Sequence, residues 1–207
     1  DRRSQRSRGR EAHMVNIAVF ASGNGSNFEN IIHAIEKQQL TDAVCVLLVV
    51  DHEDAYAITR AKQLHIPWIY VNPKAFPSKA EYEMLIDEKL REYGVELIVL
   101  AGYMRFIGSV LLERYFNRII NLHPAYLPAF PGAHSILDAY EAKAEFTGVT
   151  VHYVDAGVDS GEIIHQEKIL IDPKWDLETL EEHVHALEYD MFPRVIQMVV
   201  NRIKEEV

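Results

Sequence analysis

The chain has 207 residues, of which 48% are hydrophobic and 25% are charged, a composition typical of a globular protein with a sizeable core. Its 31 acidic side chains outnumber its 21 basic ones, which argues against a general DNA- or RNA-binding protein. The longest apolar run, Ala43–Val50, is far shorter than the roughly 20 residues that a membrane helix needs. The only cysteine, Cys45, lies in that run, so no disulfide can form within the chain and the reducing cytoplasm is the expected location.

Residues 1–13 differ from the rest of the chain. The segment Asp1–Arg10 contains five arginines and no apolar residue, and Met14 follows shortly afterwards. We interpret residues 1–13 as a vector-derived or disordered leader in preference to a nucleic-acid-binding arm, and we expect residues 14–207 to form a single domain. Without the leader the chain is still more acidic, so an anionic ligand would have to be held by backbone amides and a few local bases.

From Val15 onward, short apolar segments alternate with amphipathic ones. The expected strands are Val15–Ala21, Ala43–Asp51, Trp68–Val71, Val95–Ala101 and Arg118–Asn121. The expected helices begin near Asn27, run from about Asp54 to Leu64, and run from Ser78 to Tyr93, where a serine cap precedes the helix and Gly94 follows it. Apolar strands separated by helices predict an α/β fold with a mainly parallel, twisted sheet that is covered on both faces.

After Gly132 the pattern changes. A helix is expected over His134–Ala144, followed by two strands, Gly148–Val154 and Glu162–Ile171, whose alternation is typical of antiparallel pairing. One long helix, Asp176–Lys204, is expected to close the chain, with a kink near Pro193. In open α/β sheets, ligands bind beyond the carboxyl ends of the strands, so the loops after the first, fourth and fifth strands are the places to search for a site.

The most informative of these loops follows the fifth strand. Asn121 and His123 are two residues apart at a strand end, so their side chains should project to the same side. An amide that can donate to an oxyanion and an imidazole that can exchange protons near pH 7 suit acyl transfer. This spacing alone is more often structural than catalytic. A second polar cluster, Asp155–Gly161, could supply the carboxylate that such an imidazole needs.

Two further loops allow a functional and an ordinary interpretation. Ser22–Asn27 contains two glycines before a helix, which favours an anion site, although an ordinary glycine-rich connection is equally consistent. It does not fit the dinucleotide-binding pattern G-x-G-x-x-G, because the third glycine is missing. Ala101–Ile107 could wall a flat apolar pocket or simply pack against the core. The histidines show no metal-ligand spacing, so no metal site is expected.

Taken together, these motifs resemble phosphoribosylglycinamide formyltransferases, a family that formylates glycinamide ribonucleotide in purine synthesis with 10-formyltetrahydrofolate as co-substrate. The resemblance extends from about Val15 to Lys204. It is carried by Ser22–Asn27, Ala101–Arg105, Asn121–Pro128, Pro131–Gly132, Gly148–Tyr153 and Asp159–Gly161. It implies a Rossmann-like formyltransferase fold, a cytoplasmic enzyme that acts on two small molecules, no nucleic-acid or membrane partner, and a monomer or homodimer.

The resemblance also implies three groups of site residues. The catalytic residues fall on Asn121, His123 and Asp159. The ribonucleotide-binding residues fall on Gly25, Ser26, Asn27 and Glu188. The folate-binding residues fall on Lys79, Met104, Arg105, Phe106, Ile107, Asp155 and Asp159. Some members have arginine in place of Lys79, and many have serine and leucine in place of Ala125 and Tyr126, so the contacts of these positions can differ.

Other functions compete with this one. Formyltetrahydrofolate hydrolase shares the catalytic residues, but it is expected to carry a regulatory domain before the first strand. Methionyl-tRNA formyltransferase is expected to carry a further carboxy-terminal domain and a basic surface for tRNA. A nucleotide-binding regulatory module would explain the sheet and the glycine-rich loop, but it would leave Asn121, His123 and Asp159 without a reason to converge.

Overall fold

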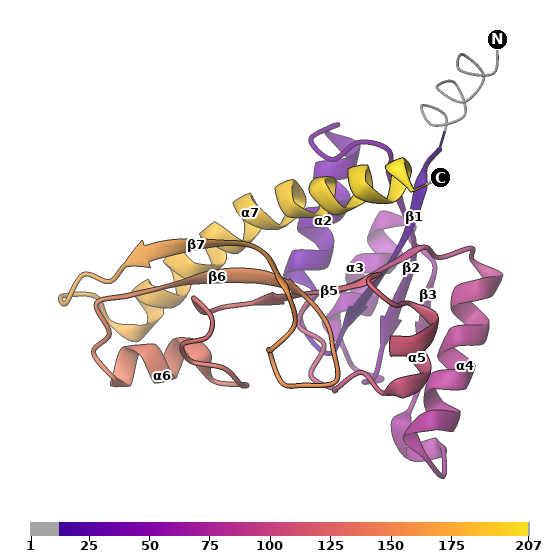
Figure 1. Ribbon diagram of the computed structural model, residues 1–207, viewed down its shortest axis with the longest axis horizontal. Coiled ribbons are helices and arrows are strands. Elements are labelled where there is room, and N and C mark those ends of the chain that lie inside the picture. The colour runs from indigo at the N-terminus through magenta and orange to yellow at the C-terminus, as the bar shows by residue number, and fades with distance from the viewer. Residues whose placement is uncertain (1–12, 207) are drawn as a thin grey trace.

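The computed structural model describes residues 13–206 as a seven-stranded sheet with helices on both faces (Figure 1). The expected leader lies outside the described residues, apart from His13. The strands are β1 (Val15–Ala21), β2 (Ala43–Val50), β3 (Trp68–Tyr70), β4 (Leu97–Leu100), β5 (Ile119–His123), β6 (Phe146–Tyr153) and β7 (Ile163–Leu170). Their order in the sheet is β3-β2-β1-β4-β5-β6-β7.

The sheet has a parallel part and an antiparallel part. All pairings from β3 to β5 are parallel, whereas β6 pairs antiparallel with β5 and β7 pairs antiparallel with β6. This confirms the predicted α/β fold with an antiparallel C-terminal portion. The strand order reverses between β1 and β4, so the loops that follow these two neighbouring strands diverge and leave a crevice at the carboxyl edge.

Two hydrophobic clusters cover the two faces of the sheet. The first packs α2 (Ser26–Glu36), α3 (Tyr56–Leu64) and α7 (Leu177–Glu205) against one face. The second packs α4 (Lys79–Glu92) and α5 (Ser109–Arg114) against the other. The short helix α6 (Ser135–Glu141) adds Ile136 and Tyr140 to the first cluster. Because both faces are covered, the parallel strands are almost entirely apolar.

Several predicted boundaries were wrong by a few residues. Helix α3 begins at Tyr56 instead of Asp54, α6 is shorter at both ends than expected, and β5 continues to His123. The extension of β5 has a physical cause, since Leu122 and His123 pair with Val151 and Thr150 of β6. The chain also contains α5 and a short 3-10 helix (Pro73–Ala75), which were not predicted. Helix α7 continues through Pro193.

The serine cap predicted at the start of α4 is confirmed. The hydroxyl of Ser78 accepts a hydrogen bond from the backbone N–H of Glu81 at 3.2 Å. Replacing Ser78 by alanine should therefore lower the free energy of unfolding by about 1 kcal/mol, as measured by urea denaturation. Ser78→Asp is the matched control, because aspartate also caps helices, and it should retain most of the stability. Equal losses in both variants would contradict a capping role for the hydroxyl.

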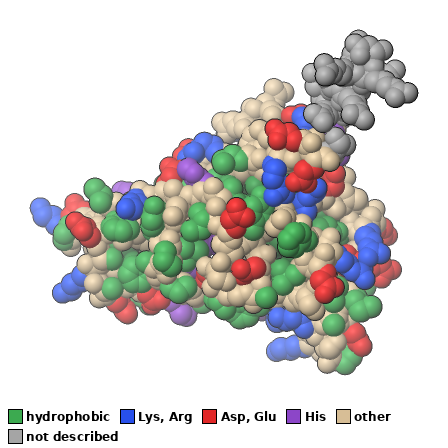
Figure 2. All heavy atoms as spheres, in the orientation of Figure 1, with side chains coloured by type: hydrophobic (Ala, Val, Ile, Leu, Met, Phe, Trp, Pro, Cys, Tyr) green, Lys and Arg blue, Asp and Glu red, His purple; other side chains and the backbone are tan. Residues whose placement is uncertain are grey.

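The surface has no strongly basic region on the face shown in Figure 2. Lys and Arg side chains lie there in small groups among Asp and Glu side chains. None of the helices formed by residues 13–206 combines the length and the apolar character needed to cross a membrane.

Candidate active site

A cavity of about 610 Å³ lies at the carboxyl ends of β1, β4 and β5. Its wall combines the loop after β1, the loop after β4, the end of β5, the loop Val154–Asp159 and one turn of α7. This is the crevice where the strand order reverses, as the sequence predicts for a ligand site. Every residue that the sequence assigns to the site lines this cavity except Lys79.

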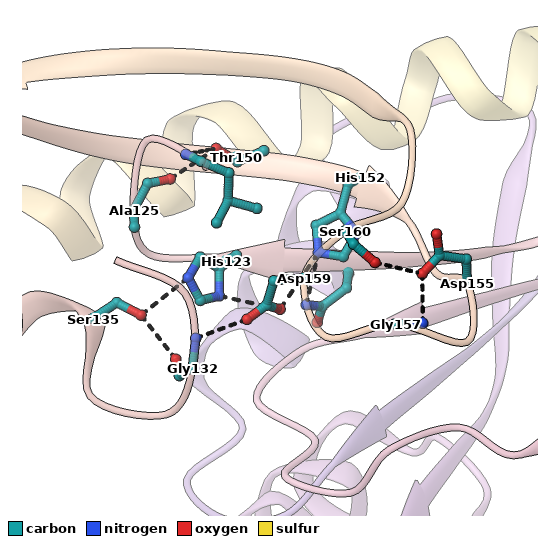
Figure 3. Close-up of polar contacts among 12 residues, drawn as sticks. His123, Ala125, Gly132, Ser135, Thr150, His152, Asp155, Gly157, Asp159 and Ser160 are labelled. Carbon is teal, nitrogen blue, oxygen red and sulfur yellow. Dashed lines mark hydrogen bonds and ion pairs between the residues drawn. The ribbon is translucent and has the colours of Figure 1, made fainter. Parts of the chain in front are cut away.

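Asn121, His123 and Asp159 converge inside the cavity. Asn121 and His123 project to the same side of β5, while Ile120 and Leu122 between and beside them join the hydrophobic cluster on the other face. The Oδ1 atom of Asp159 lies 3.5 Å from Nδ1 of His123 (Figure 3). The expected convergence of strand end and loop is thus observed, although Asp159 is 36 residues further along the chain than His123.

The carboxylate of Asp159 is held in place by the proline-rich loop. Its Oδ2 accepts a hydrogen bond of 2.9 Å from the backbone N–H of Gly132. Asp159 itself has a φ angle of 51°, a left-handed conformation that aspartate and asparagine tolerate better than most residues. The loop is anchored in turn by Thr150 of β6, whose hydroxyl donates to the carbonyl of Ala125 and accepts from the N–H of Leu127 (Figure 3).

A second histidine, His152, belongs to this cluster and was not assigned a role from the sequence. It pairs directly with Asn121 across the β5–β6 register, and its Nε2 lies 3.3 Å from Nδ2 of Asn121 and 3.7 Å from Oδ1 of Asp159. Its Nδ1 lies 2.8 Å from the carbonyl of Tyr153, so Nδ1 carries the proton and Nε2 accepts from Asn121. One N–H of the Asn121 amide is therefore used by His152, and the other is free to bind a ligand.

At one end of the cavity, the loop after β1 leads into the N-terminus of α2. Gly25 precedes this helix with a φ angle of 76°, and a Cβ atom placed there would lie 2.6 Å from Cβ of Ala57. Only glycine fits this position, so the amides that follow it can face the cavity. Arg60 of α3 holds the loop from behind, with bonds to the backbone and side-chain oxygens of Asn24. The loop has the geometry of an anion site at a helix N-terminus.

Glu188 faces this loop from α7 and is only 5% exposed. Its Oε2 accepts from Nδ2 of Asn27 at 2.9 Å, and its Oε1 lies 2.7 Å from Nδ1 of His185. The two residues are three apart on one helix, so they share a face, which is the only signal that the sequence offered for His185. The hydrogen bond to Glu188 raises the pKa of His185 above its ordinary value of 6.5.

The shift of the His185 pKa makes the stability depend on pH. Because the folded protein favours protonated His185, the contribution of the pair to stability should be complete below pH 6.5 and should disappear as the pH rises through the raised pKa. In Glu188→Gln the NMR titration midpoint of His185 should move down. The difference in Tm between wild type and this variant should shrink with rising pH. Glu178→Gln, an exposed change on the same helix, is the control and should leave the midpoint unchanged.

At the other end of the cavity, the loop after β4 presents apolar side chains. Met104 and Phe106 are 69% and 66% exposed and both line the cavity, so a ligand bound there could cover them. The guanidinium of Arg105 does not point freely into the cavity, because its Nε donates to the buried carboxylate of Asp51 at 2.8 Å. The hydroxyl of Ser22 accepts from the N–H of Met104 at 2.9 Å and joins the two loops.

Helix α4 fixes the far end of this loop. Lys79, which lies outside the cavity, donates from Nζ to the carbonyl of Phe106 at 2.9 Å. The buried carboxylate of Glu83 accepts from the N–H groups of Gly108 and Leu111 at the start of α5. In this structure Lys79 therefore supports the loop. Its expected contact with a ligand stays a prediction.

The loop Val154–Asp159 covers the cavity from the side of β6. Oδ1 of Asp155 accepts from the N–H of Gly157 and from the hydroxyl of Ser160, both at 2.9 Å (Figure 3). These bonds close a turn that carries Asp159 toward His123. Among residues 13–206, no group of three or more His, Cys, Asp or Glu side chains is placed to hold a metal ion.

Comparison with known proteins identifies the family. The description "Formyl transferase" belongs to the family whose model matches residues 15–196. The chain belongs to the formyl transferase family. It is 49% identical over 187 residues to phosphoribosylglycinamide formyltransferase of Bacillus subtilis (strain 168), which covers 90% of this chain and 95% of that protein.

Solved structures of formyl transferases have the same fold. Glycinamide ribonucleotide transformylase 1 from Geobacillus kaustophilus is 45% identical, with a TM-score of 0.88 over 91% of this chain and 100% of that chain. Phosphoribosylglycinamide formyltransferase from Streptococcus pneumoniae TIGR4 is 43% identical, with a TM-score of 0.84 over 90% of this chain and 99% of that chain. The match to the family model, residues 15–196, includes every residue that lines the cavity, since these lie between Ser22 and Glu188.

Proposed function

We propose that this formyl transferase moves the formyl group of 10-formyltetrahydrofolate to the amine of glycinamide ribonucleotide, a step of purine biosynthesis. The observation that carries the proposal is the convergence of Asn121, His123 and Asp159 in one cavity. An anion-binding loop lies at one end of that cavity and exposed apolar side chains lie at the other. Relatives that cover nearly the whole chain carry the name of this activity.

The ribonucleotide suits the end formed by α2 and α7. The amides of Gly25, Ser26 and Asn27 would bind its phosphate, because the helix N-terminus offers free N–H groups and a positive dipole end. The carboxylate of Glu188 would accept from ribose hydroxyls, and His185 beside it would add a donor. The amine of the substrate would then reach toward Asn121 and His123 at the centre of the cavity.

The folate suits the end formed by the loops after β4 and β6. Its flat pteridine ring would cover the exposed side chains of Met104 and Phe106, with Ile107 beneath them and Asp155 and Asp159 on the opposite wall. Arg105, already paired with Asp51, would shape this wall more than it would supply charge. To bind the carboxylates of the folate tail, Lys79 would have to give up its hydrogen bond to the carbonyl of Phe106. The effect of Lys79→Ala on folate affinity tests this contact.

In the reaction, the amine nitrogen attacks the formyl carbon and a tetrahedral intermediate forms. The free N–H of Asn121 and the protonated imidazole of His123 would stabilise its oxyanion, and one such donor typically contributes roughly 3–4 kcal/mol. Asp159 would stabilise protonated His123 and accept the proton that the amine loses. That proton goes to the folate nitrogen as its bond to the formyl carbon breaks, which leaves tetrahydrofolate and the formylated ribonucleotide.

Two alternatives make different measurable predictions. A hydrolase would consume 10-formyltetrahydrofolate at the same rate with and without the ribonucleotide, whereas a transferase requires it. A dinucleotide-binding module would bind NAD. In this chain Phe28, which is fully buried, occupies the position of the required third glycine. Spectroscopic loss of 10-formyltetrahydrofolate, together with calorimetric titrations of glycinamide ribonucleotide and NAD, distinguishes the three functions.

The proposal includes a cytoplasmic location and a monomer or homodimer. The support for the location is the single cysteine, whose burial raises the pKa of its thiol to about 12 and leaves it unreactive. The oligomeric state is to be measured by light scattering of the full chain.

A further inference from the structure

Ser135, the first residue of α6, contacts the imidazole of His123 on the side that faces away from Asp159 (Figure 3). Both residues are buried, with exposed fractions of 2% and 4%. The hydroxyl oxygen of Ser135 lies 3.0 Å from Nε2 of His123 and 2.9 Å from the carbonyl oxygen of Gly132. The same Nε2 lies 3.1 Å from the carbonyl oxygen of Phe130.

These three contacts determine where the protons lie. A carbonyl only accepts, so the hydroxyl of Ser135 must donate its single proton to Gly132. The hydroxyl oxygen then accepts a hydrogen bond from Nε2–H of His123. The carbonyl of Phe130 accepts from the same N–H, so the two acceptors share it. If Nε2 were unprotonated, Ser135 would have to donate to it instead. The carbonyls of Gly132 and Phe130 would then each face another acceptor in this half-buried place, which is unfavourable.

We propose that Ser135 is a positioning residue that, with the carbonyl of Phe130, keeps the proton on Nε2 of His123. The proton that is gained and lost is therefore the one on Nδ1. Nδ1 faces Oδ1 of Asp159 at 3.5 Å, and Nε2 of His152 approaches the same oxygen at 3.7 Å. When both imidazoles are neutral, Nδ1 of His123 and the carboxylate of Asp159 are both acceptors and face each other, while Nε2 of His152 accepts from Asn121. A proton on Nδ1 would lie between the imidazole and the carboxylate of Asp159.

This inference rests on the proposed function only in taking His123 as the reacting imidazole. It adds that the hydroxyl of Ser135 acts through His123 without touching a substrate. Its loss should leave binding of both substrates unchanged and should lower the turnover. The conservative change Ser135→Thr should keep the effect of the hydroxyl, because threonine offers the same donor and acceptor.

The test begins with the tautomer of His123 in the full chain without substrates. Protein labelled with ¹⁵N-histidine is followed by multiple-bond ¹H–¹⁵N spectra over a pH series, with His123→Gln used to assign the signals. On deprotonation, Nδ1 should move to the unprotonated position while Nε2 stays protonated. A neutral His123 that keeps its proton on Nδ1 would overturn the inference. This measurement needs no activity, so a chain without formyl transfer would fail the proposed function and leave the tautomer result intact.

The second measurement compares Ser135→Ala with Ser135→Thr. The alanine variant should show more of the Nδ1–H tautomer and a kcat lower by roughly tenfold, with both KM values nearly unchanged. The threonine variant should restore both properties. Thr147→Val is the matched control, because the buried hydroxyl of Thr147 has no hydrogen-bond partner among the described residues. A change in kcat without a change in tautomer, or the reverse, would overturn the role of Ser135. If the alanine variant does not fold, the tautomer of neutral His123 in the wild-type and threonine proteins tests the inference, and a proton on Nδ1 in either would overturn it.

Discussion

Replacing Asp159 by asparagine should lower kcat by roughly 10²- to 10⁴-fold, the range expected when a group that moves protons in the transition state is lost. Asparagine keeps the shape, tolerates the left-handed backbone at this position and can still accept from the N–H of Gly132. It removes the negative charge that stabilises protonated His123 in the proposed mechanism. Ribonucleotide affinity, measured by calorimetry, should change little, since the charge is needed mainly in the transition state.

The control for this variant separates chemistry from turn formation. Oδ1 of Asp172 accepts from the N–H of Lys174 at 2.9 Å in an exposed turn after β7. Asp172→Asn preserves that cap and should keep full activity. If Asp159→Asn stays within about threefold of wild type, on a scale where 1.4 kcal/mol is tenfold, Asp159 only shapes its turn and does not belong to the catalytic residues.

Replacing Gly25 by alanine should weaken ribonucleotide binding by more than about tenfold, equivalent to 1.4 kcal/mol, and should leave folate binding nearly intact. The added Cβ would lie 2.6 Å from Cβ and 2.8 Å from Cα of Ala57, and the φ angle of 76° disfavours any side chain. The loop must therefore move, and its amides lose the arrangement that binds phosphate. Calorimetric titration with each substrate separately measures the two affinities.

Gly94 provides the matched control for strain without a binding role. It has a φ angle of 64° and ends α4 on the opposite side of the sheet from α2. Gly94→Ala should lower the stability, as strain in a left-handed position requires, and should leave both affinities unchanged. If Gly25→Ala weakens both substrates equally, the loop after β1 supports the whole site and is not specific for the ribonucleotide.

The strands and long helices could be predicted because each is specified locally. Buried parallel strands appear as uninterrupted apolar runs, and α4 carries its own serine cap and terminal glycine. Helix α5 could not be predicted in this way, because its six residues are too few for a periodic pattern. Its first turn is held by Glu83, which belongs to another helix. The boundary of β5 shifted because its last two residues pair with β6, a contact that the local sequence does not show.

The site residues likewise divide into those that a local pattern reveals and those that depend on contacts distant in the sequence. The spacing of Asn121 and His123 at a strand end marks them as candidate site residues. Nothing near Glu188 in the sequence distinguishes it from the other acids of α7. Its partner Asn27 is 161 residues away, so only the fold or a family resemblance can reveal the pair. His152 was missed for a related reason. Its role depends on the antiparallel register that places it opposite Asn121, and register is a property of two strands together.

The antiparallel pairing of β5 with β6 has a consequence for how this chain can tolerate insertions and deletions. Successive residues of a strand face opposite sides, so one residue added to β6 between Thr150 and His152 would turn His152 toward the hydrophobic cluster that contains Val149 and Val151. An added residue in the turn at 142–145, before β6 begins, shifts neither side chain. Changes of length that preserve activity are therefore expected in the turn at 142–145 and not between Thr150 and His152, only a few residues further along the chain.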